Sequence, residues 1–379
     1  MNYRSRWQER RRKEAQKRLA IGLAALACIV LGVILVNRLG ADSHVWVTDL
    51  HVRAPVFLTH DGGILYCSSP GRLAQALRIE DGSVVWPDPF RPYMGSGGPP
   101  VVLEDRIVVF SDDGRATSLD RRTGEPGWQM GTGYPIRCTP LMYEGILYLG
   151  CDDGNAYAVN AKTGVEIWRS HARSPVNSGF AYLRGALVFG TSDGRILCVN
   201  AKTGKPARWR SRRLGLSINA GPVLVGDELV FGTDGGRAYF VDTVSGMVTR
   251  HVEMPGLGAV RADPVSDGDS LYVVSTDGWL VACDLAGDPA DGPLEPRWAR
   301  DIGRELSAGP VLSEGLIYCG NGTQALLAVD AGTGRIVRRW KSPTPVRGSI
   351  VAAGDYVLAG TQDGQVVAFK APKVKRSGD

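Results

Sequence analysis

Residues 158–168 read Ala158-Val159-Asn160-Ala161-Lys162-Thr163-Gly164-Val165-Glu166-Ile167-Trp168, and parts of this stretch recur along the chain of 379 residues. Its last residue belongs to a ladder of seven tryptophans spaced 40 to 42 residues apart, with one double step: Trp46, Trp86, Trp128, Trp168, Trp209, Trp298 and Trp340. His251 stands 42 residues after Trp209, in the middle of the double step. A fixed period of about 40 residues is typical of repeat architectures. The ladder therefore predicts eight similar units.

Each unit is expected to contain four short strands. In the unit 138–168, mostly apolar segments at 140–142, 146–150, 155–160 and 165–168 are separated by turns that contain glycine. Asp153-Gly154 suits a two-residue hairpin, because glycine tolerates a positive φ and aspartate can accept hydrogen bonds from turn amides. The Thr163-Gly164 turn follows Asn160, which is placed to cap it. Similar turns in the other units predict an antiparallel meander in each of them.

Four-stranded units repeated eight times indicate an all-β fold, an eight-bladed β-propeller of four-stranded antiparallel blades. We expect this propeller to cover residues 44–371. The last unit ends after its third strand, near 365–369, whereas 44–50 stands alone before the first full unit. The simplest explanation is that 44–50 completes the last blade, which closes the ring and removes an exposed sheet edge.

The N-terminus predicts a membrane anchor. Residues 1–18 contain eight basic and two acidic side chains, and residues 19–36 carry no charge. A helix of that length measures about 27 Å and can span the hydrocarbon core of a bilayer. The basic tail is expected to stay in the cytoplasm. The linker 37–43, the propeller and the tail 372–379 would then lie in the periplasm or outside the cell.

Two alternatives to a retained transmembrane helix stay open. Ala25-Leu26-Ala27 resembles the cleavage site of a signal peptide, and Cys28 could carry the acyl chain of a lipoprotein. Both are disfavoured because the apolar segment 29–36 would then open the mature chain. All three interpretations predict export.

Composition excludes several classes of function. Residues 1–18 carry a charge of +6 and the remainder −1, so the net +5 gives the propeller no electrostatic basis for binding nucleic acid. The cysteines after the anchor form no CxxC motif and are expected to act as small buried apolar residues. The five histidines lack metal-ligand spacing. We therefore assign no catalytic, cofactor-binding or metal-binding residue.

The stretch 158–168 resembles the tryptophan-docking motif AxDxxTGxxxW of quinoprotein propellers. Residues 328–334 match its first part, and 118–128 and 76–86 are looser copies. The resemblance covers 44–371 and implies that the ladder residues pack against neighbouring blades. The implied docking residues are Trp46, Trp86, Trp128, Trp168, Trp209, His251, Trp298 and Trp340.

The resemblance leaves two functions to compare. One kind of quinoprotein propeller is a dehydrogenase that uses pyrroloquinoline quinone and calcium, and the other is the lipoprotein scaffold of outer-membrane protein assembly. The dehydrogenases are much longer and typically carry adjacent cysteines, which this chain lacks. A membrane-tethered scaffold that binds a protein partner and no cofactor is therefore favoured, with the dehydrogenase as the alternative. The expected transmembrane helix departs from the lipoprotein pattern and would place the propeller at the inner membrane.

One set of polar residues is a candidate binding site. The segments that enter the innermost strands carry them at matching positions: Arg137, Asn177, Asn219, Arg261, Ser307 and Arg347. In a propeller these residues should ring one mouth of the channel, where several arginines could bind an anionic ligand or an acidic peptide. The alternative is an ordinary solvated rim.

The anion hypothesis can be tested by replacing its three cations. Arg137→Ala, Arg261→Ala and Arg347→Ala together should abolish binding of an anionic ligand or acidic peptide, measured by titration calorimetry. Unchanged binding would reject the ring as the site.

Overall fold

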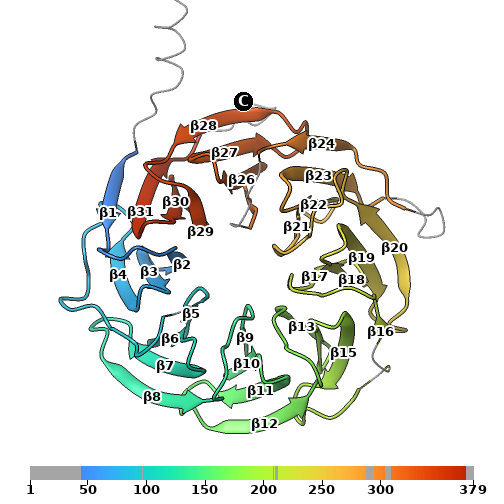
Figure 1. The fold of residues 1–379 in the computed structure, drawn as a ribbon, viewed down its shortest axis with the longest axis horizontal. Helices are drawn as coiled ribbons and strands as arrows, with labels where there is room; N and C mark the ends of the chain where they lie inside the picture. Colours follow the sequence, from blue (N-terminus) through green and yellow to red (C-terminus); the bar gives the residue numbers. More distant parts are fainter. Residues whose placement is uncertain are drawn as a thin grey trace, which may run out of the picture. The chain divides into compact units, whose positions relative to one another are not determined.

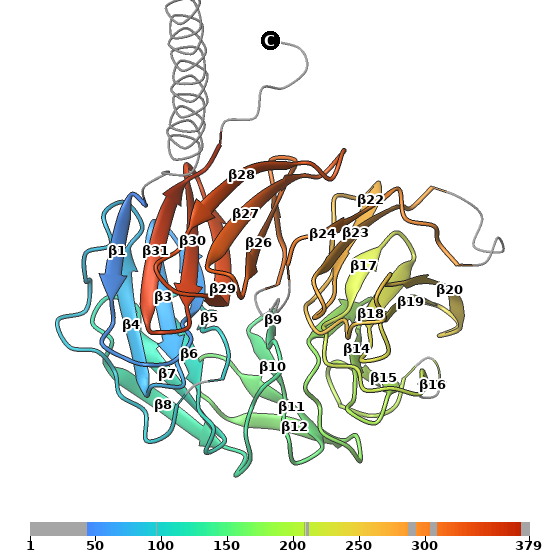
Figure 2. The same ribbon diagram turned by 45° about the horizontal axis from the view of Figure 1, so that its top comes forward.

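The structure is a computed structural model that describes residues 44–95, 97–207, 209, 212–286, 293–303 and 309–372. Eight antiparallel sheets surround a central channel, which confirms the predicted all-β, eight-bladed propeller (Figure 1). Each blade steps from an inner strand at the channel to an outer strand at the circumference (Figure 2). The predicted segments 1–18, 19–36 and 37–43 lie outside the described residues. Within the described part, no helix is long and apolar enough to cross a membrane.

The strands of blades 1 to 4 follow one another along the chain, each blade starting at the channel. Blade 1 contains β2 (Phe57–Asp61), β3 (Ile64–Ser69) and β4 (Leu73–Arg78). Blade 2 contains β5 (Val101–Val102), β6 (Arg106–Phe110), β7 (Arg115–Asp120) and β8 (Pro126–Gly131). Blade 3 contains β9 (Leu141–Tyr143), β10 (Ile146–Gly150), β11 (Asn155–Asn160) and β12 (Glu166–His171). Blade 4 contains β13 (Phe180–Leu183), β14 (Ala186–Gly190), β15 (Arg195–Asn200) and β16 (Arg212–Arg213).

Blades 5 to 8 continue the ring. Blade 5 contains β17 (Val223–Val225), β18 (Glu228–Gly232), β19 (Arg237–Asp242) and β20 (Val248–Glu253). Blade 6 contains β21 (Val265–Ser266), β22 (Ser270–Val274), β23 (Trp279–Asp284) and β24 (Trp298–Asp301). Blade 7 contains β25 (Val311–Ser313), β26 (Leu316–Asn321), β27 (Ala325–Asp330) and β28 (Ile336–Lys341). Blade 8 contains β29 (Val346–Ala353), β30 (Tyr356–Thr361), β31 (Gln365–Lys370) and, from the other end of the propeller sequence, β1 (Trp46–Asp49).

The ring closes as the sequence predicts. β1 pairs antiparallel with β31, with Trp46 opposite Ala368 and Asp49 opposite Gln365. The outer edge of blade 8 is thus covered by the first strand of the propeller, so strand pairing joins the two ends of the domain.

Blade 1 departs from the predicted four strands. Its sheet has three strands, and the segment that should form the fourth touches β4 through only two isolated bridges, Leu77 to Val84 and Ala74 to Phe90. Pro87 and Pro89 stand between these bridges and cannot donate to a strand ladder. The prolines therefore leave two single bridges in place of a continuous outer strand.

The two ends of the ring carry different connections, because the strands of each blade alternate in direction. We call the end with the Thr-Gly turns, such as 161–164, and the first hairpins, such as 144–145, the turn face. The loop face is the opposite end, with the second hairpins, such as 151–154, and the connections between blades, such as 172–179. The capping predicted for the turn face is present, since Asn160 Oδ1 accepts from the backbone N–H groups of Lys162 and Thr163 at 3.0 Å.

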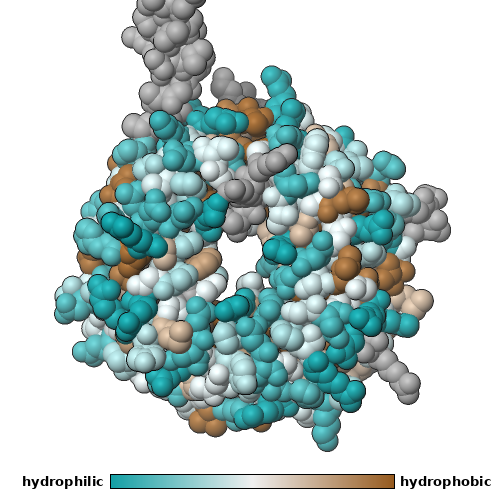
Figure 3. All heavy atoms as spheres, viewed as in Figure 1, coloured by the Kyte–Doolittle hydropathy of each residue, from teal (hydrophilic) through white to brown (hydrophobic). Residues whose placement is uncertain are grey.

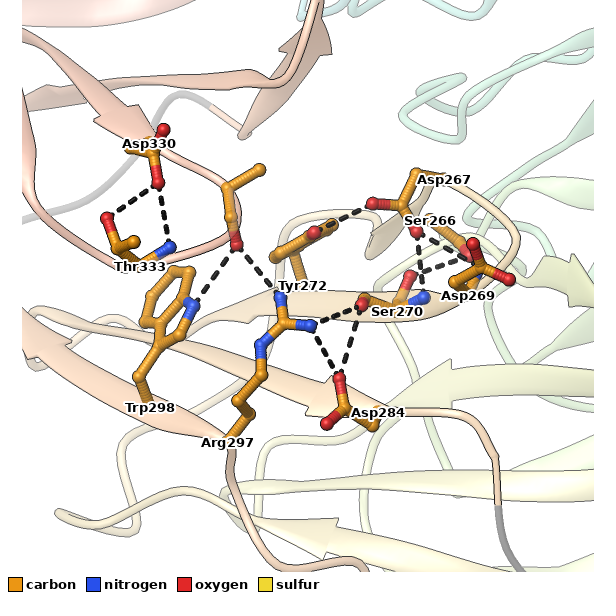
Figure 4. Close-up of polar contacts among 11 residues, drawn as sticks. Ser266, Asp267, Asp269, Ser270, Tyr272, Asp284, Arg297, Trp298, Asp330 and Thr333 are labelled. Carbon is orange, nitrogen blue, oxygen red and sulfur yellow. Dashed lines mark hydrogen bonds and ion pairs between the residues drawn. The ribbon is translucent and has the colours of Figure 1, made fainter. Parts of the chain in front are cut away.

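A tryptophan of one blade docks on the Thr-Gly turn of the next. Trp128 Nε1 donates to the carbonyl of Ala161 at 3.0 Å, and Trp168 Nε1 donates to Ala201 at 2.9 Å. Figure 4 shows the same contact for Trp298, whose Nε1 lies 3.1 Å from the carbonyl of Ala331. Trp46 and Trp86 make equivalent bonds to the carbonyls of residues 79 and 121.

The glycine of the receiving turn is required for two reasons. Gly164 has a φ of +72°, and a Cβ built on it would lie 2.5 Å from the Trp128 ring. The same crowding by the preceding tryptophan occurs, within 2.4 to 2.7 Å, at Gly82, Gly124, Gly204, Gly246 and Gly334. Glycine therefore supplies both the left-handed backbone and the flat surface on which the indole lies.

His251 is not the residue that replaces the missing tryptophan. In blade 3, Trp168 lies opposite Ala158, and the residue opposite the equivalent Phe240 in blade 5 is Arg250. The Arg250 side chain is buried, stacks over the Phe240 ring at 4.6 Å and pairs with Glu228 at 2.8 Å. Its Nη1 reaches the carbonyl of Leu285 in blade 6 at 3.4 Å. The sequence interval pointed one residue too far, because spacing does not show which side chain faces the neighbouring blade.

Both irregular junctions occur where the receiving blade lacks the glycine-containing turn that follows the third strand in the other blades. In blade 6 the chain continues from Leu285 into the inserted segment that contains residues 287–292, which lie outside the described part. In blade 8 the outer strand is β1, so no such turn follows β31. There Trp340 packs on Phe369 with ring centroids 5.6 Å apart. At both junctions the residue in the docking register is an arginine: Arg250 lies opposite Phe240 and Arg338 opposite Ala328, so Trp340 stands two residues beyond the predicted docking position.

The glycine requirement can be separated into its two causes. Gly145 has a φ of +76°, and a Cβ added to it would meet nothing within 4 Å, whereas Gly164 has a similar backbone and faces Trp128. Gly145→Ala should cost about 1–2 kcal/mol for the left-handed backbone alone. Gly164→Ala should lower the free energy of unfolding in urea by at least about 2 kcal/mol more, because the indole must move. Equal losses would show that the indole contact adds nothing.

Removal of one partner of the Arg250–Glu228 pair should destabilise the protein more than replacement of both partners. Arg250→Ala leaves the Glu228 carboxylate buried without its cation and should lower the free energy of unfolding by about 3–5 kcal/mol. Lys370→Ala removes an exposed partner of Asp355 and should cost less than about 1 kcal/mol in the same urea titration. Arg250→Met combined with Glu228→Gln should recover most of the loss. A loss for Arg250→Ala no larger than for Lys370→Ala would contradict this account.

Candidate functional site

The sequence-predicted ring residues lie where the chain passes from the loop face into the innermost strands. Each segment is held by a backbone bond from the second hairpin of its own blade, as in Asp152 N to Pro135 O at 3.0 Å and Gln362 N to Pro345 O at 2.8 Å. The same bond recurs before Asn177, Asn219 and Arg261. The structure therefore places Arg137, Asn177, Asn219, Arg261 and Arg347 at equivalent points of one channel mouth. Ser307 lies outside the described residues.

Carboxylates that the sequence analysis did not assign to this site accompany the arginines. Arg137 lies between Asp112 and Asp152, with nitrogen–oxygen distances of 3.8 and 3.7 Å. Arg261 Nε lies 3.0 Å from Asp234, which also receives weaker hydrogen bonds from Asn219. An anion at this mouth would have to compete with these three carboxylates. Two of them stand directly before Asp-Gly turns, and this Asp-Asp-Gly pattern is the sequence signal that could have revealed them.

The mouth opens into a cavity of about 890 Å³ in the central channel. Figure 3 shows the opening at the centre of the ring, surrounded mainly by hydrophilic and neutral surface. Arg261 and Arg347 line this cavity, together with Asp263, which the sequence analysis did not single out. Two of the predicted ring residues thus face a space large enough for a ligand.

Several connections between blades on the loop face expose apolar side chains. The connections from blades 1, 2, 4 and 5 expose Tyr93 at 74%, Tyr134 at 58%, Leu216 at 53% and Leu257 at 57%. Large apolar side chains at several neighbouring loop tips are typical of a surface that another molecule covers. The sequence analysis missed these residues, because a single leucine in a loop has no distinctive spacing.

The two leucines are held in different ways, Leu257 by its backbone conformation and Leu216 by its packing on a glycine. Leu257 has a φ of +57°, at the loop position where Gly133 and Gly215 stand in other connections. A left-handed backbone costs an L-residue about 1–2 kcal/mol. The Leu216 side chain lies over Gly235, where a Cβ would be 2.3 Å from it. Leu257 is therefore retained at a conformational cost, and backbone strain of this kind clusters at functional positions.

The cysteines and acidic residues of the described part give little support for catalysis. The six cysteines of the propeller are all buried: Cys67, Cys138, Cys151, Cys198, Cys283 and Cys319. Burial raises the pKa of the Cys138 and Cys283 thiols to about 12, which keeps both thiols protonated at neutral pH. Within the described ranges, no group of three or more His, Cys, Asp or Glu side chains could hold a metal ion.

Comparison with known proteins identifies relatives of the whole propeller. The family model described as outer membrane protein assembly factor BamB matches residues 33–138, 135–339 and 286–376. No curated protein sequence matches the chain.

Solved structures share the fold at low sequence identity. BamB from Moraxella catarrhalis is 18% identical with a TM-score of 0.72, over 88% of this chain and 99% of that one. Sqt1 from Saccharomyces cerevisiae is 12% identical with a TM-score of 0.75, over 88% and 100%. The quinohemoprotein alcohol dehydrogenase ADHIIG from Pseudomonas putida HK5 is 15% identical with a TM-score of 0.67, over 89% and 78%. At these identities the likeness shows the fold alone.

Proposed function

Since the chain belongs to the family of the outer membrane protein assembly factor BamB, we propose that it is a non-enzymatic scaffold that binds a protein partner through its loop face. The observation that carries this proposal is the exposure of large apolar side chains on the loop-face connections: Tyr93, Tyr134, Leu216 and Leu257.

The chemistry of this surface suits a protein partner. Tyrosine and arginine are enriched among the residues that contribute most to protein interfaces, and both types stand on this face. Arg137 and Arg261 are more than half exposed and are oriented by carboxylates of the same face, so they could serve as a polar rim. Such an interface needs no bound cofactor.

The tether is part of the proposal. Trp46 packs on the Gly82 turn, so the chain enters the propeller on the turn face. If residues 19–36 span the membrane, the linker 37–43 tethers the propeller to it, and the propeller would lie in the periplasm or outside the cell.

The scaffold function can be tested with in-cell crosslinking of the full chain. Tyr134→Ser, Leu216→Ser and Leu257→Gly together should reduce crosslinked partner at least tenfold, because they remove the apolar anchors. Leu257→Gly also relieves the left-handed backbone, so the variant should not be less stable than the parent. Val165→Ser with Ile167→Ser alters exposed apolar residues at the beginning of the outer strand of blade 3 and should leave crosslinking unchanged.

The purified full chain also tests the alternative that the protein is a dehydrogenase. Purified and supplied with pyrroloquinoline quinone and calcium, it should reduce no dye in the presence of alcohols. Saturable quinone binding with dye reduction would overturn the scaffold proposal, as would crosslinking that the loop-face variant does not reduce.

A further inference from the structure

The rings of Tyr143 and Tyr182 lie against each other at the junction of blades 3 and 4. Their centroids are 3.8 Å apart and their planes differ by 23°, whereas ordinary aromatic pairs in proteins lie about 4.5–7 Å apart. Among the tyrosines that the structure describes, no other two have their rings in contact. The contact therefore holds two phenols unusually close to each other.

The register of the inner strands brings the two rings together. Tyr143 is the last residue of β9, and Tyr182 is the last but one of β13. Successive side chains of a strand point to opposite faces of its sheet. Because β9 and β13 are the inner strands of adjacent blades, one ring points forward to blade 4 and the other points back to blade 3. At the next junction the equivalent residues are Leu183 and Leu224.

The pair is accessible from solvent on the turn face. Tyr143 is 36% exposed, and Tyr182 is half-buried. Desolvation raises the pKa of the Tyr143 phenol, and the carboxylate of Glu144 and the hydroxyl of Tyr182 raise it further. The Tyr143 hydroxyl is therefore protonated at neutral pH, and it lies near both the hydroxyl of the partner ring and a carboxylate that can accept its proton.

Two adjacent phenols can be coupled by one-electron oxidation. Loss of one electron and one proton converts a phenol into a phenoxyl radical, whose unpaired electron is shared by the oxygen and the ring carbons ortho to it. Two such radicals that face each other form a carbon–carbon bond between ortho positions. Each bonded carbon then releases its hydrogen as a proton and each oxygen regains one, which restores both aromatic rings. In total, two C–H bonds break, one C–C bond forms, and two electrons and two protons leave.

We propose that Tyr143 and Tyr182 are a modification site, at which a one-electron oxidant forms an intramolecular dityrosine crosslink. Two equivalents of the oxidant accept the two electrons, and the two protons pass to solvent, one of them through the Glu144 carboxylate. The crosslink joins the inner strands of blades 3 and 4 covalently, so these blades cannot separate at this point. The site is on the turn face, apart from the loop-face surface proposed for a protein partner.

The experiment is photo-oxidation of the purified full chain in detergent with tris(bipyridine)ruthenium and persulfate, which generate a small one-electron oxidant. Dityrosine fluorescence should appear in the monomer band of a denaturing gel, with a yield that does not depend on protein concentration. Mass spectrometry of a tryptic digest should find the peptides of Tyr143 and Tyr182 linked, with the loss of two hydrogen atoms. The crosslinked protein should melt several degrees higher, because the link restricts the unfolded chain.

Substitutions connect the crosslink to the two named rings. Tyr143→Phe and Tyr182→Phe each keep an aromatic ring in the contact and remove one phenol. Each should preserve the melting temperature of the unoxidised protein and lower the yield of crosslinked monomer at least tenfold. Tyr148→Phe is the matched control, because Tyr148 lies near the pair but is buried and packs beside Trp168. Tyr134→Phe removes an exposed tyrosine of the loop face, and neither control should change the yield.

The proposal fails if the oxidised monomer contains no dityrosine, if the yield survives either phenylalanine substitution in the pair, or if the linked peptides do not join Tyr143 to Tyr182. The scaffold proposal is judged separately. Tyr182→Phe should still crosslink to the partner in cells, and the loop-face variant should still form dityrosine.

Discussion

The contact between an indole and a Thr-Gly turn is the interaction on which the ring depends. Each blade is a small twisted sheet with two apolar faces, and it becomes stable only when both faces are covered by neighbours. In most interfaces a tryptophan closes the outer part, where its ring lies on a glycine, and in several its Nε1 donates to a carbonyl, as for Trp128 on Gly164 and Ala161. The contact runs in one direction around the circle, so each blade both donates a docking residue and receives one.

The exceptions to this contact show how strongly donor and acceptor are coupled. In blade 3, the small Ala158 lets Tyr148 approach the Trp168 ring at 6.1 Å. In blade 5, the larger Phe240 occupies the alanine position, and Arg250 replaces the tryptophan. The arginine can reach the carbonyl of Leu285 although blade 6 has no Thr-Gly turn to receive an indole. A change in the receiving blade is thus compensated in the donating blade.

The structural contacts and the candidate binding groups lie in different parts of the propeller. The docking residues and their glycines are on the turn face and between the blades. Leu216, Leu257 and the arginine–aspartate pairs are on the loop face, where connections can vary without disturbing the interblade contacts. Asp263 lines the channel cavity, at a position where glycine is sufficient in blades 4, 5 and 7. Function can therefore change while the ring is preserved.

The sequence by itself determined the repeat, the number of blades and the closure by residues 44–50. The repeat period and the turn residues can be identified directly from the order of the amino acids. It also located the arginines of one channel mouth, since equivalent positions in a ring must meet. Only the tertiary structure decided that Arg250 and not His251 docks, that Asp112, Asp152 and Asp234 accompany the arginines, and that Asp263 faces the cavity. These facts depend on which side chain faces which neighbour, and a one-residue difference in register reverses that choice.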